Sequence, residues 1–332
     1  MADGGMLKHI HVVPLAAESL GVRSMCTYVE TSDVKILLDP GVSLCPNRFN
    51  LPPHPLEFKA ILRCREKIAE AAMKADVITL SHYHFDHHTP SYEDWLCNWT
   101  ERDETAREIY ENKLVLAKHP RENINFSQRR RAWIFQKTGG SFAKKLEEAD
   151  GKTFLFGSTK LSFSRPVFHG PENSALGWVI MATVEFDGER LLFAPDVQGP
   201  ISRQTLNIIL EEKPRLLIIG GPPLYLTGFR IDEEQVAESF RNLGEVVAAV
   251  PYVILEHHIL RDADWRTKAE NVLAKAERQG HKVMTAAEFL GLENLFLEAN
   301  RKRLFEEKPP SRDFEKWMRK SDGEKRRTPP PL

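Results

Sequence analysis

Residues 82–88 have the sequence HYHFDHH, and this stretch decides how the rest of the chain is interpreted. It follows the apolar run VITL at 77–80, with Ser81 between them, so it stands where a buried strand should end. His82 and His84 share one face of an extended chain, where their imidazoles can converge on one metal ion. Asp86 and His87 follow where the chain should turn, and they can face a second ion. Imidazole and carboxylate ligands suit zinc, iron or manganese, so the stretch predicts a metal site.

The predicted site needs partners from elsewhere, because such a metal takes four to six ligands and one segment cannot surround it. Candidate ligands follow three later strand patterns: His169, then Asp196, then the pair His257 and His258. Open α/β sheets build their sites at the C-terminal ends of strands. We therefore expect these residues to join the first stretch.

The order of the predicted elements indicates an α/β fold. Each half of the chain begins with a strand meander and continues with alternating helices and strands, and Asp187-Gly188 is a hairpin signal. We expect strands at 9–15, 22–30, 34–38, 76–80, 113–117, 153–156, 160–168, 178–186, 190–193, 215–219 and 252–256, and helices at 56–74, 202–212, 233–247 and 264–279.

With these residues in place, the chain resembles the metallo-β-lactamase superfamily. Asp39 after a strand, the His-x-His-x-Asp-His element at 82–87, His169, Asp196 and a final histidine match its five motifs in order. The resemblance implies a four-layer αββα sandwich. The chain is more closely similar to an uncharacterised prokaryotic family of that fold. That likeness lies at 18–24, 39–42, 51–55, 81–84 and 127–131.

The resemblance also implies a role for each residue of the site. The first ion would be bound by His82, His84 and His169, the second by Asp86, His87 and the final histidine, with Asp196 bridging the two. Asp39 would not bind metal; it would orient the histidines from behind.

The final histidine is ambiguous, because His257 and His258 are both available. His257 is favoured, since Arg261 stands four residues after it, as in the tRNA 3′-processing branch of the superfamily. His88 is also extra to the pattern. It is an alternate ligand or a supporting residue, and a place on the surface is favoured.

The implied activity is hydrolysis with two divalent metal ions, zinc first, with iron or manganese as alternatives. The two ions would share a water and lower its pKa, and the resulting hydroxide would attack a phosphorus or carbonyl centre, with Asp86 taking its proton. We expect a small phosphodiester, lactone or ester as substrate. Two alternatives stay open: an RNA or DNA nuclease of the same fold, and an iron-dependent oxidoreductase similar to a persulfide dioxygenase, which binds one iron.

The densest basic cluster is Arg129, Arg130 and Arg131, in a helical, basic insert around 91–150. Arginine matches phosphate geometry, so the cluster is a candidate for substrate binding over the site, beside the plainer interpretation as a solvated helix face. The net charge of -1 argues against a long nucleic-acid footprint. A small molecule is therefore favoured over nucleic acid as the partner, and the oligomeric state is left open.

The length of 332 residues suits one large domain, which we expect at 1–307, followed by a flexible charged tail at 308–332 that is poor in apolar residues. The four cysteines lack C-x-x-C spacing and indicate reduced thiols in a cytoplasmic protein. No apolar run is long enough for a membrane span.

Overall fold

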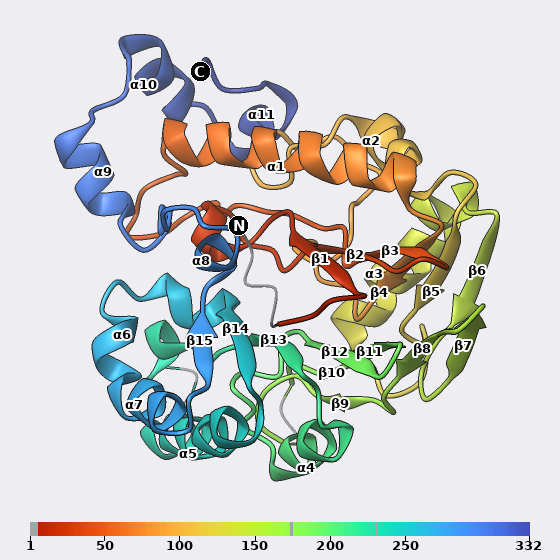
Figure 1. Ribbon diagram of the computed structural model, residues 1–332. Helices are drawn as coiled ribbons and strands as arrows, with labels where there is room; N and C mark the ends of the chain where they lie inside the picture. The colour runs from red at the N-terminus through yellow and green to blue at the C-terminus, as the bar shows by residue number, and fades with distance from the viewer. Residues whose placement is uncertain (1–5, 173–174, 230) are drawn as a thin grey trace.

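The computed structural model describes residues 6–172, 175–229 and 231–332, so residues 1–5 of the expected domain lie outside the described part. Two β-sheets pack face to face, and helices cover the outer side of each (Figure 1). The layers therefore follow the order helix, sheet, sheet, helix. The predicted αββα sandwich is confirmed.

The first sheet contains six strands in chain order. They are β1 (His11–Pro14), β2 (Thr27–Glu30), β3 (Lys35–Leu38), β4 (Val77–Leu80), β5 (Leu114–Ala117) and β6 (Lys145–Glu148). The first three strands pair antiparallel, and β3 to β6 pair parallel.

The second sheet contains seven strands, parallel on one side and antiparallel on the other. In spatial order they are β15 (Lys282–Met284), β14 (Tyr252–Glu256), β13 (Leu216–Gly220), β12 (Glu189–Ala194), β11 (Ala182–Phe186), β8 (Thr159–Phe163) and β7 (Thr153–Phe156). Strands β12 to β15 pair parallel, while β7, β8, β11 and β12 pair antiparallel. The short strands β9 (Val167–Phe168) and β10 (Trp178–Val179) form a separate antiparallel pair.

The helices cover the two outer faces. Over the first sheet lie α1 (Pro55–Lys74), α2 (Arg102–Tyr110) and α3 (Phe126–Lys137); over the second lie α4 (Arg203–Glu212), α5 (Glu233–Ala249) and α7 (Glu270–Arg278). The remaining helices are α6 (Trp265–Lys268), α8 (Ala286–Phe289), α9 (Arg301–Glu307), α10 (Arg312–Met318) and α11 (Asp322–Arg327).

Side chains of the central strands alternate between two buried faces. On β3, Leu37 packs toward the helices of the first sheet, whereas Ile36 and Leu38 pack between the two sheets. On β13, Leu217 packs toward the helices of the second sheet and Leu216 toward the first sheet. Because both faces are buried, such strands have continuous apolar sequences, which made the strands at 76–80 and 215–219 recognisable.

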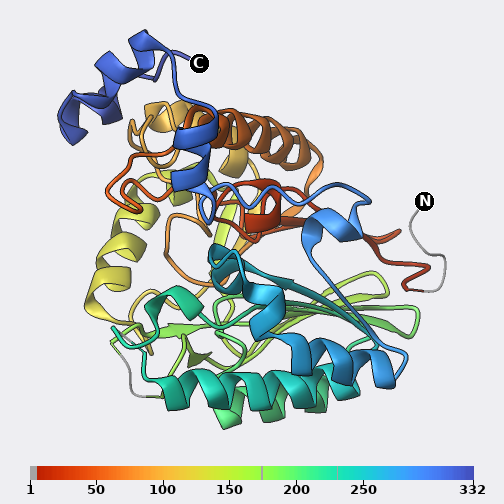
Figure 2. The same ribbon diagram turned by 90° about the vertical axis from the view of Figure 1, so that its left-hand side faces the viewer.

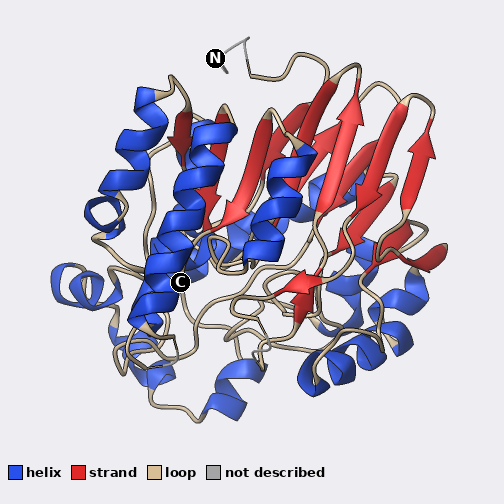
Figure 3. Cartoon of the chain, turned by 90° about the horizontal axis from the view of Figure 1, so that it is seen from below, coloured by secondary structure: helices blue, strands red, loops and turns tan. Residues whose placement is uncertain are grey.

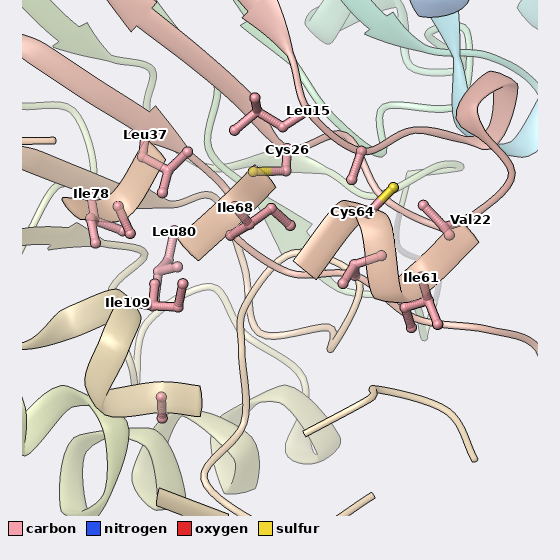
Figure 4. Close-up of a cluster of buried hydrophobic side chains, with 14 of the residues drawn as sticks. Leu15, Val22, Cys26, Leu37, Ile61, Cys64, Ile68, Ile78, Leu80 and Ile109 are labelled. Carbon is pink, nitrogen blue, oxygen red and sulfur yellow. The ribbon is translucent and has the colours of Figure 1, made fainter. Parts of the chain in front are cut away.

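Helix α1 starts at a capping box, because the His54 side chain accepts from the helix backbone and Glu57 accepts from the backbone N–H of His54. The buried side of this helix packs against the first sheet through Ile61, Cys64 and Ile68 (Figure 4). Cys26 lies in the same apolar cluster. All four cysteines are free thiols.

The structure divides several predicted elements. Each of two expected strands is interrupted by a bend. The stretch 160–168 forms β8 and β9, and the stretch 178–186 forms β10 and β11. The helix expected at 264–279 breaks into α6 and α7. The segment 91–150, expected as a helical insert with one strand at 113–117, supplies that strand as β5 and also the unexpected β6, so it continues the first sheet.

The prediction of a flexible tail at 308–332 is wrong. Helices α10 and α11 lie against α1 (Figure 1). Phe314 and Trp317 are buried, with ring centroids 6.0 and 5.4 Å from that of Phe58 on α1. Two large apolar side chains therefore anchor this segment to α1, although its charged composition predicts no such contact.

No helix in the described ranges combines the length and the apolar character that a membrane span requires.

Replacing Phe314 by alanine tests this docking. Phe314 is fully buried, so the truncation should lower the free energy of unfolding by about 3–5 kcal/mol, measured by urea denaturation. Phe126→Ala is the matched control, because its ring is 82% exposed, and it should change stability by less than about 0.5 kcal/mol. Equal stability of the two variants would mean that the segment is not docked.

Candidate metal centre

The candidate ligands come together where strands of both sheets end. His82 follows β4 of the first sheet, while Asp196 and His257 follow β12 and β14 of the second. His169 follows the short strand β9. Figure 3 shows the connecting loops gathered at one end of the two sheets. Segments more than 170 positions apart in the sequence thus meet at one place.

One group of ligand atoms contains His82, His84, His169 and Asp196, all within 4.8 Å of one another. Asp196 Oδ2 lies 2.8 Å from His169 Nε2, 3.2 Å from His82 Nε2 and 3.8 Å from His84 Nδ1. These are the residues expected around the first ion, together with the expected bridging carboxylate.

A second group contains Asp86, His87 and His257, again within 4.8 Å. His257 Nε2 lies 3.5 Å from Asp86 Oδ2 and 3.0 Å from Asp196 Oδ1, and His87 Nε2 lies 3.5 Å from Asp196 Oδ2. The Asp196 carboxylate therefore touches both groups, in the position expected of a bridge.

The chemistry of this donor set fits divalent metal ions. His87 Nε2 and Asp196 Oδ1 are buried and have no hydrogen-bond partner within the described residues. Buried polar atoms without partners are costly, and a metal ion would occupy their lone pairs. Nitrogen and carboxylate oxygen donors accommodate zinc, iron and manganese alike.

The protonation states of three ligands suit metal binding, whereas His87 differs. Burial lowers the pKa of the His82 and His84 imidazoles, which keeps them neutral, as metal ligands must be. Burial alone would raise the pKa of Asp86, but the neighbouring His87 and His257 outweigh it and lower that pKa. The carboxylate is thus held ionised. Burial alone would lower the pKa of His87, but the neighbouring Asp196 and Asp39 outweigh it and raise that pKa well above its usual value.

Asp39 forms a further compact group with His82 and His87, and its hydrogen bonds support these rings from behind. Its Oδ2 accepts from His87 Nδ1 at 2.8 Å, and its Oδ1 accepts from the backbone N–H of Ser81 at 2.7 Å. The Ser81 hydroxyl also contacts Asp39 and lies 3.0 Å from His82 Nδ1. Asp39 thereby orients a ring of each group.

Backbone strain accompanies this geometry. Asp39, Asp196 and His257 have φ angles of 47°, 49° and 64°, in the left-handed region that non-glycine residues rarely adopt. Each such residue costs on the order of 1 kcal/mol or more, and such strain clusters at functional sites. At Gly41, a Cβ would lie 2.2 Å from the backbone nitrogen of His88, so only glycine lets this loop pass so close to the histidine motif.

Both candidates for the final ligand reach Asp196 Oδ1, His257 Nε2 at 3.0 Å and His258 Nε2 at 3.4 Å, and His257 Nε2 also lies 3.5 Å from Asp86. Arg261 Nη1 lies 3.0 Å from His258 Nδ1, and arginine can only donate. His258 Nδ1 must therefore accept, so a neutral ring carries its proton on Nε2 and has no lone pair there for a metal. His257 Nε2 lies near both Asp86 and Asp196, and Arg261 Nη2 lies 3.3 Å from the same nitrogen, so Arg261 contacts both candidate rings.

The expectation that His88 lies on the surface is wrong. Its side chain is buried, its Nδ1 lies 2.9 Å from the carbonyl oxygen of His84, and its ring packs on Phe85 and Phe135. Burial lowers the pKa of His88 to about 3, so the ring is neutral. It supports the loop and belongs to neither group of ligand atoms.

A cavity of about 1010 Å³ opens over the ligands. Of the three arginines expected there, only Arg131 lines it, with its guanidinium 4.8 Å from the centre of the Phe85 ring. Arg129 and Arg130 line a different groove. The candidate role over the site therefore fails for Arg129 and Arg130, which take the alternative place on an outer helix face, because consecutive helix positions point in different directions.

Sequence reasoning missed three other arginines in the cavity wall: Arg23, Arg261 and Arg326. They form ion pairs with Glu298, Glu18 and Asp94, respectively. Arg261 had a signal in its spacing from His257, whereas Arg326 lies in the segment expected to be a tail and had none.

No family model matches the sequence. The UPF0282 protein of Methanopyrus kandleri is 45% identical over 299 residues, covering 89% of this chain and 99% of that protein. The UPF0282 protein of Thermococcus gammatolerans is 45% identical and covers 89% of this chain and 95% of that protein. Neither name states an activity. The expected likeness to a prokaryotic family is confirmed.

Three solved structures are similar over most of this chain. CmlA, a diiron β-hydroxylase from Streptomyces venezuelae, has a TM-score of 0.47 and 14% identity, covering 83% of this chain and 52% of that one. A diphosphatase of the PhnP family has a TM-score of 0.44 and 10% identity, covering 75% of this chain and 86% of that one. The short form of human tRNase Z has a TM-score of 0.42 and 11% identity, covering 74% of this chain and 91% of that one. At these values none of the three activities transfers to this chain.

The support given by Asp39 predicts a metal-binding defect in Asp39→Asn. The amide is uncharged and holds the His87 and Ser81 donors more weakly, so metal affinity should fall by roughly 10- to 100-fold. Competition with a chromogenic chelator measures the change. Asp76→Asn is the control, since Asp76 accepts from the backbone of Lys35 far from the ligands and should leave the affinity unchanged. An Asp39→Asn affinity equal to the wild type would disprove the role.

Proposed function

The chain belongs to the UPF0282 family of archaeal proteins, and we propose that it is a metal-dependent hydrolase that acts on a small phosphodiester. One observation carries the proposal. The Asp196 carboxylate is shared by two groups of buried ligand atoms at the base of a cavity lined by arginines.

The ligands supply the reactive centre. Two divalent ions bound there would acidify a water and stabilise the oxyanion that develops on the substrate. Asp86 is held ionised and reaches the cavity, so its carboxylate can accept the proton of the attacking water. Asp39 keeps the His87 ring in place during the reaction.

His258 has a separate part in this proposal. Its Nδ1 accepts from Arg261, so in the neutral ring Nε2 carries the hydrogen, and Nε2 lies 3.4 Å from Asp196 Oδ1 beside the candidate ligands. The residue lines the cavity. The Nε2–H can donate to the oxygen of the leaving group.

The cavity favours an anionic substrate over a neutral lactone. Arg23, Arg261 and Arg326 are held by carboxylates, but among the described residues no carboxylate lies within ion-pair distance of Arg131. A positive charge that reaches the cavity without a carboxylate partner complements a phosphate oxygen. We therefore assign Arg131 to substrate binding.

The metal requirement is tested by elemental analysis of the wild type and of Asp196→Ala. We expect two ions of zinc, iron or manganese per wild-type chain, and less than one in the variant because both groups lose a shared ligand. Hydrolysis of bis(p-nitrophenyl) phosphate should disappear with the metal. No bound metal after metal-replete expression, or unchanged metal and turnover in Asp196→Ala, would refute the proposal. A single iron per chain would favour the dioxygenase alternative.

The substrate class is tested with Arg131→Ala. Losing a charged hydrogen bond to phosphate should raise KM for bis(p-nitrophenyl) phosphate by about tenfold or more, and Arg131→Lys should restore part of it. Hydrolysis of the neutral p-nitrophenyl acetate should be unaffected. Arg63→Ala, on the exposed side of α1, is the matched control. Equal effects on both substrates would argue against an anionic substrate.

A further inference from the structure

The outer face of α3 exposes two aromatic rings beside two arginines. Phe126, Arg129, Arg130 and Trp133 are spaced i, i+3, i+4 and i+7, so they lie on one side of the helix. Phe126 is 82% exposed and Trp133 is 60% exposed. In Figure 2, α3 runs along the outer side of the molecule. Two large aromatic rings exposed side by side are typical of an interaction surface.

These residues line a groove of about 350 Å³ that also includes Pro120, Arg121 and Gln136. Arg129 reaches across toward the preceding loop, where its Nη2 donates to the carbonyl oxygen of Arg121 at 3.2 Å. Neither the Phe126 ring nor the Trp133 ring stacks on another aromatic ring in the part of the chain that the structure describes. The faces of both rings are therefore available to a ligand.

The charge of the groove is positive and not neutralised locally. Within the described ranges, no carboxylate lies within ion-pair distance of Arg121, Arg129 or Arg130. The acidic side chains of the adjoining segments, Glu122 and Glu148, lie 3.9 and 3.4 Å from His119 Nε2 instead. The groove thus combines guanidinium groups that no carboxylate neutralises with exposed aromatic faces.

We propose that this groove binds single-stranded nucleic acid. Unpaired bases stack on aromatic side chains, and the phosphates between them pair with arginine, which is the combination used by surfaces that hold single strands. A duplex keeps its bases stacked inside, so it would leave Phe126 and Trp133 unused. The patch is small, which agrees with a chain whose net charge is only -1.

The groove lies beside the metal centre but is separate from it. Arg130 faces the groove, and the next residue, Arg131, faces the cavity over the ligands. Helix α3 therefore stands between the two, and a strand held on its outer face would lie next to the cavity. Binding at the groove needs no metal, so it does not rest on the proposed hydrolysis.

The experiment is fluorescence anisotropy with a fluorescein-labelled 12-nucleotide oligouridylate, titrated with the full chain over a range of salt concentrations. Trp133→Ala should weaken binding by about tenfold without changing its salt dependence, because stacking releases no counterions. Arg129→Ala/Arg130→Ala should also weaken binding, and should reduce the slope of log K against log salt by about 1.4, or 0.7 for each phosphate.

Two controls separate this site from general charge and from catalysis. Arg63→Ala/Lys67→Ala removes two exposed charges from α1 and should leave binding unchanged. Asp196→Ala should also bind as the wild type does, even if it has lost metal and turnover. The proposal is overturned if the oligonucleotide does not bind in 50 mM salt, if Trp133→Ala has no effect, or if a 12-residue oligoglutamate or a duplex RNA of the same length binds equally well.

Discussion

The arrangement of the site depends on one buried carboxylate, that of Asp196. Six histidine rings lie within 4.0 Å of it: His82, His84, His87, His169, His257 and His258. An ionised carboxylate so deeply buried is unfavourable unless positive charge or hydrogen-bond donors surround it. The ends of strands from both sheets meet around this group. The donor set therefore forms only when the two sheets pack face to face.

The convergence of these side chains requires strained backbone angles at three of the residues. Asp39, Asp196 and His257 all take left-handed φ angles just after a strand ends, which turns each side chain from the sheet toward the centre. Tight packing of the three apolar cores on either side of and between the sheets holds these angles. A rigid frame for the ligands is what a preorganised metal site needs.

Two segments on the periphery give the site its surroundings. The C-terminal helices dock on α1 through Phe314 and Trp317, and this places Arg326 in the cavity wall beside Asp94. Helix α3 presents Arg131 to the cavity and Arg129 and Arg130 to the outer groove. The chain thereby surrounds its ligands with positive charge although its overall charge is close to zero.

The sequence by itself determined the α/β class, most strand and helix positions, and the cluster of candidate metal ligands, because continuous apolar runs mark buried strands and the histidines and aspartates stand close after them. The tertiary structure decided what depends on contacts between distant segments. It buried His88 and docked residues 308–332, where Phe314 and Trp317 outweigh a charged composition. It also separated Arg131 from Arg129 and Arg130, since the orientation of a helix relative to a cavity is set by packing and leaves no periodic signal in a run of identical residues.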